Sequence, residues 1–519
     1  MKQRILKILA VLLVAVLLVG CSGTEERVIT RFSEMEYTRP DVSLVEDALA
    51  ACEQSVADEE PLEDLEEKIV TFIDLYNSYY TQYCLANIHY SKDTTDEYWT
   101  EENNFCVENT AVVDAALDQL YYLLADSIHR EALEGEDYFG EDFFDDYEGE
   151  SLWDDTFTAL MEKEAELTNR YYELSGLEMD DENILALAEL YAEMILLRMD
   201  IAEYAGFDSY AEFAYDFYYA RDYTPEQERI LLADIQEELV PVYRRLLTEG
   251  LSGIYIERAT EEETFHFVKK LASRIGGTVW DAFLLLEEAE LYDISVGRNK
   301  YGASFEMYLS DYDEPYIFMD PDGSTYDFLT FTHEFGHFCN DYAAEGSAVG
   351  IDVAEIFSQG LEYLSLCIFE DVGSMARLKM VDSLCVYVEQ SAYACFEQRA
   401  YSLPREEVTA ENLFDLYEQV GTEYGFDVWG FNNWDFVQIP HIFTNPMYVF
   451  SYVVSNDAAM QIYRLELEEP GAGIQLYCEN LDTEEEYFLA FLDSAGLESP
   501  FERGYMKSVR TTLEDILFG

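Results

Sequence analysis

The feature that most constrains this chain is the run His333-Glu334-Phe335-Gly336-His337, which lies in an otherwise helix-favouring stretch. Residues four apart on an α-helix differ by about 40° around the axis and by one turn along it, so both imidazoles face the same way. With six histidines in 519 residues, chance would produce a His-Glu-x-x-His run about 0.007 times. The spacing therefore predicts a helix that offers two imidazoles to one metal ion.

A catalytic zinc site needs a third protein ligand and leaves one position open for water. Glu355 lies among apolar residues in the next helical segment, and a buried carboxylate without a partner would be costly. We therefore predict one Zn²⁺ per chain, held by His333, His337 and Glu355. Glu334 lies about 100° from His333 around the helix. It is predicted to be the general base that acts on a metal-activated water.

Two more carboxylates on the Glu355 segment are candidates for orienting an imidazole. Asp352 is three residues before Glu355, and Glu362 is seven residues after it. Either side chain could accept a hydrogen bond from a ligating imidazole. Either could equally be an exposed acid on an amphipathic helix, and the sequence leaves both interpretations open.

A downstream segment, from Pro440 to Tyr452, contains one histidine and two tyrosines. His441 alone is compatible with a hydrogen-bonded core residue. Tyr448 and Tyr452 are four apart and would share one face of a helix. Because the chain has 41 tyrosines, such pairs are common, and spacing alone gives these residues no role.

Three sequence segments together resemble the thimet oligopeptidase and oligoendopeptidase F family of zinc metallopeptidases. These segments are HEFGH, AEIFSQGLE and PHIFTNPMYVFSY. The runs LLRMDIA and GFDSYAE, together with residues 300–303 and 315–319, are also similar to that family. The resemblance extends from about Leu185 to the C-terminus, whereas the preceding part is only generically helical.

The resemblance implies a role for each matching residue. His333, His337 and Glu355 would bind zinc, and Glu334 would be the base. His441 and Tyr452 would stabilise the oxyanion, with Tyr448 as a further candidate because Thr444-Asn445-Pro446 adds one residue to the usual spacing. It also implies a zinc metalloendopeptidase that acts on short oligopeptides in a deep cleft.

The expected fold is mainly α, with a large two-lobed helical body and a small β-hairpin or sheet next to the HExxH helix. Apolar residues at three- and four-residue spacing predict helices from about Val45 to Tyr215. We assign residues 45–200 to an N-terminal helical lobe and 201–519 to the catalytic domain. Residues 303–309 and 316–319 have strand-like content and predict a hairpin. Tyr316, Ile317 and Phe318 are predicted to form an edge strand that pairs with the substrate.

The N-terminus predicts export and a lipid anchor. A basic head and an apolar run from Ile8 to Val19 precede Leu18-Val19-Gly20-Cys21, which resembles a lipobox. We therefore interpret residues 1–21 as a lipoprotein signal peptide that ends at lipidated Cys21, and 22–44 as a polar tether. This predicts a bacterial membrane-anchored lipoprotein outside the cytoplasm. Eight cysteines remain without a CxxC pair, and Cys84 with Cys106 is a candidate disulfide.

The charge of the chain limits its partners. The 108 acidic and 30 basic residues give a formal charge of −78, which repels nucleic-acid backbones. We expect short peptides as substrates, contact with a bilayer only through Cys21, and a monomer. Two alternatives stay open: a zinc carboxypeptidase or dipeptidase of a related helical HExxH fold, and a non-catalytic peptide-binding lipoprotein. The intact Glu334 disfavours the second alternative, because a binder does not need that carboxylate.

Overall fold

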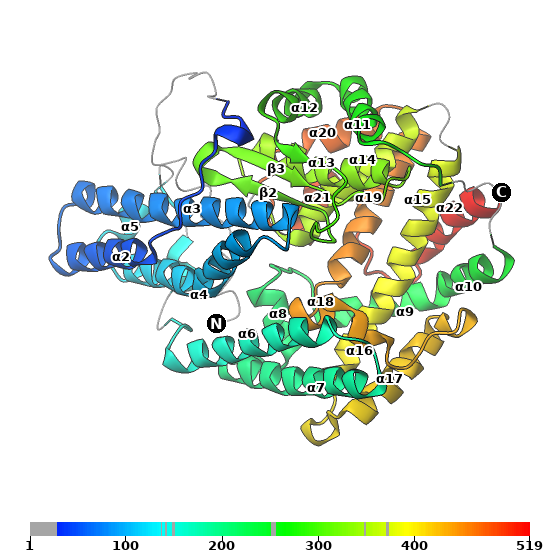
Figure 1. Ribbon diagram of the computed structural model, residues 1–519, viewed down its shortest axis with the longest axis horizontal. Coiled ribbons are helices and arrows are strands. Elements are labelled where there is room, and N and C mark those ends of the chain that lie inside the picture. Colours follow the sequence, from blue (N-terminus) through cyan, green and yellow to red (C-terminus); the bar gives the residue numbers. More distant parts are fainter. Residues whose placement is uncertain are drawn as a thin grey trace.

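The computed structural model describes residues 29–135, 138–140, 143–147, 151–250, 256–346, 349–369 and 373–519. Helices dominate these residues, and one small sheet accompanies them (Figure 1). The mainly α fold predicted from the sequence is confirmed. The predicted signal peptide, Cys21 and the first part of the predicted tether lie outside the described residues.

The first lobe contains α2 (Val42–Ala57), α3 (Leu62–Lys92), α4 (Glu97–Ala125), the short α5 (Arg130–Leu133) and the 3₁₀ turn η2 (Phe143–Tyr147). Its long helices project from the body (Figure 1). On α3 the residues at three- and four-residue spacing, from Leu65 to Tyr76, are buried in a core that is separate from the main one. This core contains residues between Val45 and Tyr147 only.

The next two helices, α6 (Asp155–Ser175) and α7 (Asp181–Tyr204), belong to the main core, which includes Phe157 and Leu187. The division between the two cores therefore lies near residue 150, whereas the sequence predicted a lobe boundary at 200. Apolar periodicity locates the buried face of a helix, but it does not say which core that face contacts.

The main body continues through fifteen more helices, whose bounds are as follows: α8 (Tyr210–Phe217), α9 (Pro225–Glu238), α10 (Val240–Glu249), α11 (Glu261–Ile275), α12 (Gly277–Ala289), α13 (Asp327–Ala344), α14 (Ile351–Ile368), α15 (Gly373–Cys385), α16 (Ser391–Ala400), α17 (Ala410–Glu423), α18 (Pro440–Thr444), α19 (Phe450–Glu468), α20 (Ala472–Glu479), α21 (Phe488–Ala495) and α22 (Met506–Phe518). At the centre, α14 packs between α13 and α19. Every residue of α14 from Asp352 to Leu366 is buried except Ala354. A helix that is apolar on nearly all sides must lie inside the protein.

The sheet contains β1 (Tyr292–Asp293), β2 (Phe305–Leu309) and β3 (Glu314–Phe318) in the order β1-β3-β2. The predicted hairpin is present, because β2 and β3 are antiparallel. The prediction that Tyr316, Ile317 and Phe318 form an edge strand is wrong. All three residues are fully buried, and β3 also pairs with β1, in parallel, on its other side. The two-residue strand β1 is too short to leave a periodic signal, so the sequence did not reveal this pairing.

The residues just before α2 contact the body. The Phe32 ring lies 4.2 Å from the Tyr316 ring, and Arg39 forms an ion pair of 2.6 Å with Glu102. The second half of the predicted tether therefore packs on the body in the described part of the chain. The candidate disulfide between Cys84 and Cys106 is not formed, and both are buried thiols.

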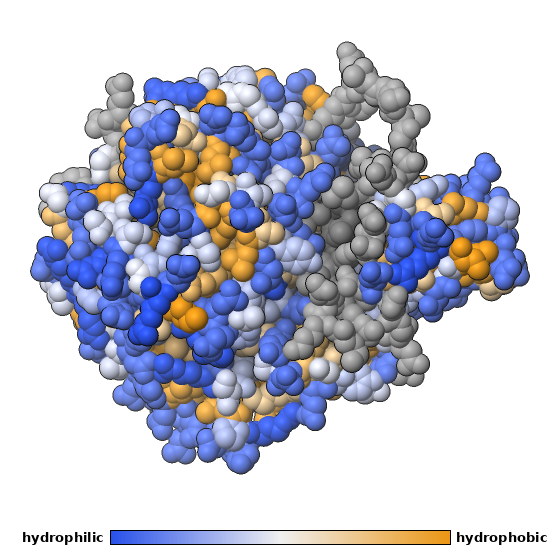
Figure 2. All heavy atoms as spheres, turned by 180° about the vertical axis from the view of Figure 1, so that it is seen from behind, coloured by the Kyte–Doolittle hydropathy of each residue, from blue (hydrophilic) through white to orange (hydrophobic). Residues whose placement is uncertain are grey.

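The face shown in Figure 2 is covered largely by hydrophilic residues, between which hydrophobic patches lie. None of the described helices combines the length and the apolar composition needed to cross a bilayer.

Candidate active site

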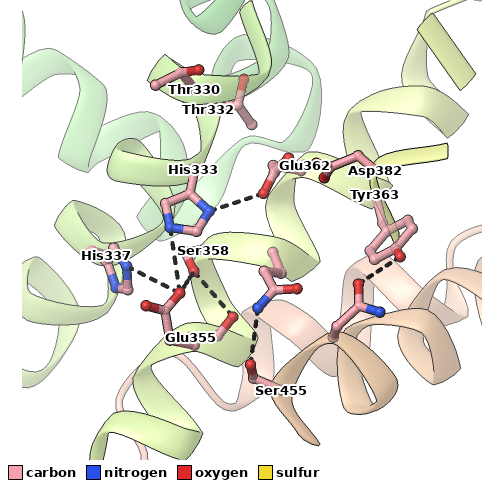
Figure 3. A network of polar contacts seen from close by, with 12 residues as sticks. Thr330, Thr332, His333, His337, Glu355, Ser358, Glu362, Tyr363, Asp382 and Ser455 are labelled. Carbon is pink, nitrogen blue, oxygen red and sulfur yellow. Dashed lines mark hydrogen bonds and ion pairs between the residues drawn. The ribbon is translucent and has the colours of Figure 1, made fainter. Parts of the chain in front are cut away.

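The two central helices bring the predicted metal ligands together. His333 and His337 lie one turn apart on α13, and both point toward Glu355 on α14 (Figure 3). The Glu355 Oε2 atom lies 3.3 Å from His333 Nε2 and 3.7 Å from His337 Nε2. The two imidazole centroids are 5.2 Å apart. Residues 18 or more positions apart in the sequence thus converge on one point.

The donor atoms fit a single zinc ion. One ligand atom from each of the three side chains lies within 4.8 Å of the other two. Zinc bonds of about 2.0–2.1 Å in a tetrahedron place neighbouring donors about 3.3–3.4 Å apart, which is close to the two distances to Glu355. Two imidazoles and one carboxylate are also a ligand set that catalytic zinc uses. The His-His-Glu group can therefore hold a metal ion.

Electrostatics at the three ligands agree with a cation at this point. Burial raises the pKa of Glu355, but the hydrogen bond with His333 and the nearby imidazoles outweigh it and lower the pKa to about 2. Burial lowers the pKa of His337 to about 4, so this imidazole is neutral near pH 7. Burial also acts to lower the pKa of His333, yet the hydrogen bonds with Glu355 and Glu362 raise it overall. A metal cation would replace that proton between His333 and Glu355.

Of the two candidate carboxylates behind the imidazoles, the structure brings only Glu362 to the site. Glu362 Oε1 lies 2.9 Å from His333 Nδ1. An ionised carboxylate can only accept, so Nδ1 donates and the Nε2 lone pair faces Glu355. Asp352 instead accepts a hydrogen bond of 2.7 Å from Tyr223 and lies 3.4 Å from Arg221 Nε. Its predicted role was wrong because a residue three positions before Glu355 lies about 60° away around the helix, whereas Glu362 lies within about 20°.

Glu334 occupies a nearly buried position beside the metal ligands. It does not belong to the His-His-Glu group. Burial raises its pKa to about 7; the charge of His333 acts in the opposite direction, while Glu355 and Glu362 reinforce the increase. A carboxyl group whose pKa lies near neutrality can both accept and return a proton at physiological pH.

An aromatic group closes the other side of the site. His441 on α18 and Tyr448 stack with centroids 5.7 Å apart, and Tyr452 on α19 lies edge-on to both rings. The Tyr448 hydroxyl donates a hydrogen bond of 3.3 Å to Glu355 Oε1. The three residues from the downstream segment therefore lie together, and Tyr448 touches a predicted ligand. The neighbouring Phe450 is buried and packs against Tyr223.

The loop before α19 is held in place by buried groups. Met447 adopts a left-handed conformation with φ of 68°, which is costly for a residue other than glycine. Its N–H donates a hydrogen bond of 2.9 Å to Glu397, and Tyr219 donates one of 2.8 Å to the carbonyl of Pro446. These contacts fix the position of Tyr448, which follows directly.

A cleft of about 2140 Å³ leads to this loop. One wall comes from α2 and α4 of the first lobe, the other from α6, and Tyr448 lies at its lining. The acidic residues of the lining are Glu46, Glu53, Glu108, Asp114, Asp154, Glu162, Glu164 and Glu166. Among the described residues, no Lys or Arg lines it. The cleft thus connects solvent with the His-His-Glu group along a negatively charged path.

Sequence reasoning missed three buried residues around the site. Ser358 donates a hydrogen bond of 2.9 Å to Glu355 Oε2, and its position three residues after Glu355 could have indicated this contact. Lys379 and Glu397 lie on separate helices, and no spacing relates them to the motif. Their contacts exist only because distant helices pack together.

Comparisons with known proteins agree with the predicted resemblance. Residues 32–151 match the family described as the peptidase M3 N-terminal domain. No curated protein sequence matches the chain. Among solved structures, PZ peptidase A with an inhibitor has a TM-score of 0.81 and 21% identity, over 94% of this chain and 99% of that chain. A Bacillus anthracis str. Ames chain assigned as an oligoendopeptidase F has a TM-score of 0.77 and 20% identity, over 94% and 98%.

A more distant likeness extends to another peptidase group. The M32 carboxypeptidase from Deinococcus radiodurans R1 has a TM-score of 0.57 and 13% identity, over 92% of this chain and 99% of that chain. All these identities are low, so the likeness to solved structures is one of fold. Together with the M3 N-terminal match, it supports a metallopeptidase of the M3/M32 type.

Proposed function

We propose that this chain, with its match to the peptidase M3 N-terminal domain and its oligoendopeptidase F-like fold, is a zinc metallopeptidase that cuts internal bonds of short peptides. The observation that carries the proposal is the convergence of His333, His337 and Glu355 beside a nearly buried Glu334. A peptide- or zinc-binding protein would need the ligands but would have no use for Glu334.

The residues of the chain divide the chemistry among them. His333, His337 and Glu355 would hold a zinc ion, which when bound lowers the pKa of water and polarises a carbonyl. Glu334 takes the proton of the attacking water and delivers it to the leaving amine, because its raised pKa suits both steps. The hydroxyls of Tyr448 and Tyr452 and the imidazole of His441 donate to the oxyanion of the substrate.

The cleft favours extended peptides over folded proteins. Its volume of about 2140 Å³ exceeds the roughly 300–1,000 Å³ of a typical small-molecule pocket. Both walls are helical, and the His-His-Glu group lies beyond the loop that holds Tyr448. A folded domain does not reach that depth, whereas an unfolded chain of a few residues does.

A second candidate function is removal of C-terminal residues, because the fold is also similar to an M32 carboxypeptidase. Such an enzyme must recognise a terminal carboxylate, which needs cationic or other strong donors. The described lining of the cleft contains many carboxylates and no Lys or Arg. A negatively charged path repels a free C-terminus, so internal cleavage is the better supported activity.

We further propose that the protein acts outside the cytoplasm as a monomer, anchored to a bacterial membrane through lipidated Cys21. The basic head, apolar run and lipobox-like residues of the N-terminus support this location. Its partners would be short peptides and the bilayer, and its charge of −78 disfavours nucleic acids. Radiolabelled palmitate should label the wild-type chain and should not label Cys21→Ala; equal labelling would contradict the anchor.

Digestion of paired peptides tests the function. The soluble form from Ser22 is loaded with zinc and given one peptide as its free acid and as its C-terminal amide, with an acetylated N-terminus. Mass spectrometry should find the same internal cut in both. Stepwise trimming of the free acid alone would favour the carboxypeptidase. Zinc binding without any cut, by wild type and Glu334→Gln alike, would favour the non-catalytic binder.

A further inference from the structure

A buried lysine lies behind the carboxylate that orients His333. Lys379 comes from α15, and its side chain is only 2% exposed. Its Nζ atom lies 2.9 Å from Glu362 Oε2 and 3.0 Å from Asp382 Oδ2. Figure 3 shows Glu362 reaching His333 from α14, with Asp382 on the far side of Glu362. A chain of four side chains thus runs from Asp382 through Lys379 and Glu362 to His333.

The two oxygens of Glu362 have different partners. Oε1 accepts from His333 Nδ1 at 2.9 Å, while Oε2 accepts from Lys379. A carboxylate that is fixed at both oxygens cannot rotate about its terminal bond without losing one contact. The imidazole of His333 is therefore held in one orientation and one tautomer, with Nε2 toward Glu355 Oε2 at 3.3 Å.

Charge balance gives Lys379 a second effect. Glu355, Glu362 and Glu334 are all nearly buried within the same small region, and the charges of the first two raise the pKa of the third. Lys379 is a buried cation in direct contact with one of these carboxylates. Without it, Glu362 would be a buried anion whose only printed partner is an imidazole, which is an unfavourable arrangement. Lys379 thus keeps Glu362 as an acceptor for His333.

We propose that Lys379 is a positioning residue of the metal centre, which fixes Glu362 and, through it, the ligating imidazole of His333. Lys379 touches no ligand itself. The inference rests on the proposed function only in requiring that a metal ion binds at His333, His337 and Glu355. The same lysine could instead merely stabilise the packing of α14 against α15, and the test must separate these roles.

Zinc affinity, measured by competition with a chelator, separates the two roles without an activity assay. Lys379→Met should weaken zinc binding by about 10- to 100-fold, the range that loss of a partner behind a ligand produces. Glu362→Gln should weaken it as well. In the double variant the Lys379→Met change should add little, because Lys379 acts through Glu362. Lys269→Met, which removes a surface pair with Glu287, is the matched control.

Each outcome decides between the roles. Unchanged zinc affinity in Lys379→Met, or losses that add in full in the double variant, would overturn the inference, whatever happens to the unfolding temperature of the metal-free protein. If Lys379→Met does not fold, Asp382→Asn replaces it; it should weaken zinc binding less, and again only while Glu362 is present. Wild-type protein that binds no zinc would instead reject the proposed function.

Discussion

Gly336 of α13 lies against the backbone of α14 at Phe357. A Cβ atom on Gly336 would lie 2.5 Å from the carbonyl oxygen of Phe357 and 2.6 Å from the Cα of Ser358. Real Cβ atoms do not approach backbone atoms so closely, so only glycine permits this helix separation. Because Glu355 is two residues before Phe357, the close approach brings its carboxylate within reach of both imidazoles.

Gly336→Ala should therefore separate the two helices. We expect a loss of about 1–3 kcal/mol in the free energy of unfolding, as for other overpacked cores, together with weaker zinc binding. Thermal unfolding and chelator competition measure the two effects. Gly302→Ala is the control, since a Cβ there meets no atom within 4 Å. Equal zinc affinity in both variants would show that helix separation does not limit the site.

Glu334→Gln should keep the metal and lose the reaction. The change removes the proton acceptor but leaves His333, His337 and Glu355 in place. Loss of general base catalysis typically costs about 10²–10⁴ in kcat. Peptide turnover and zinc content, measured on the same preparation, check this expectation. Glu345→Gln, at an exposed position at the end of α13, should behave as wild type. Near-normal turnover in Glu334→Gln would reject the assigned role.

His337→Ala should release the metal. It removes one of three ligands and leaves Glu355 without its contact at 3.7 Å. Dialysed protein should then contain far less than one zinc per chain, measured by atomic absorption. The metal-free variant should unfold at about the same temperature as metal-free wild type, which separates metal loss from misfolding. A stoichiometric zinc content in the variant would contradict the ligand assignment.

Tyr448→Phe removes one hydroxyl from the aromatic group. Loss of a single oxyanion donor typically lowers kcat by about 10²–10³, and we expect a decrease of this size with little change in KM. Zinc affinity should change less than tenfold, because Glu355 keeps Ser358 as a partner at 2.9 Å. Tyr204→Phe removes an exposed hydroxyl that contacts Asp154 and is the matched control. A decrease that appears only in KM would assign Tyr448 to substrate binding.

Glu397→Gln tests how the loop that holds Tyr448 depends on pH. Burial raises the pKa of Glu397 to about 7, so the folded protein favours its neutral form. This contribution to stability is fully present below the unfolded pKa of about 4.3 and is lost as pH rises through about 7. The glutamine stays neutral and still accepts from the Met447 N–H.

The variant should consequently be more stable than wild type at pH 8, by the order of 1 kcal/mol, with the difference shrinking toward pH 5. Urea unfolding at the two pH values measures it, with the exposed Glu411→Gln as control. A difference that does not change with pH would show that Glu397 is ionised in both states.

Much of the helical fold follows from local pattern. The spacing of Leu65, Ile69 and Phe72 predicts the buried face of α3. Thr224 and Pro225 mark the start of α9, where a capping box forms with Gln227. The alternation in residues 305–309 indicates a strand. These signals involve neighbours within a few residues, so a chain reveals them before it folds.

The sequence by itself determined the chemistry of α13, because two imidazoles and Glu334 in one helical turn have fixed relative positions. Only the tertiary structure decided which distant groups meet them. Glu362 rather than Asp352 reaches His333, Lys379 lies behind it, and β3 is a central strand rather than an edge. Helix geometry is a property of consecutive residues, whereas these contacts depend on how helices and strands far apart in the chain pack. One-dimensional spacing does not contain that information.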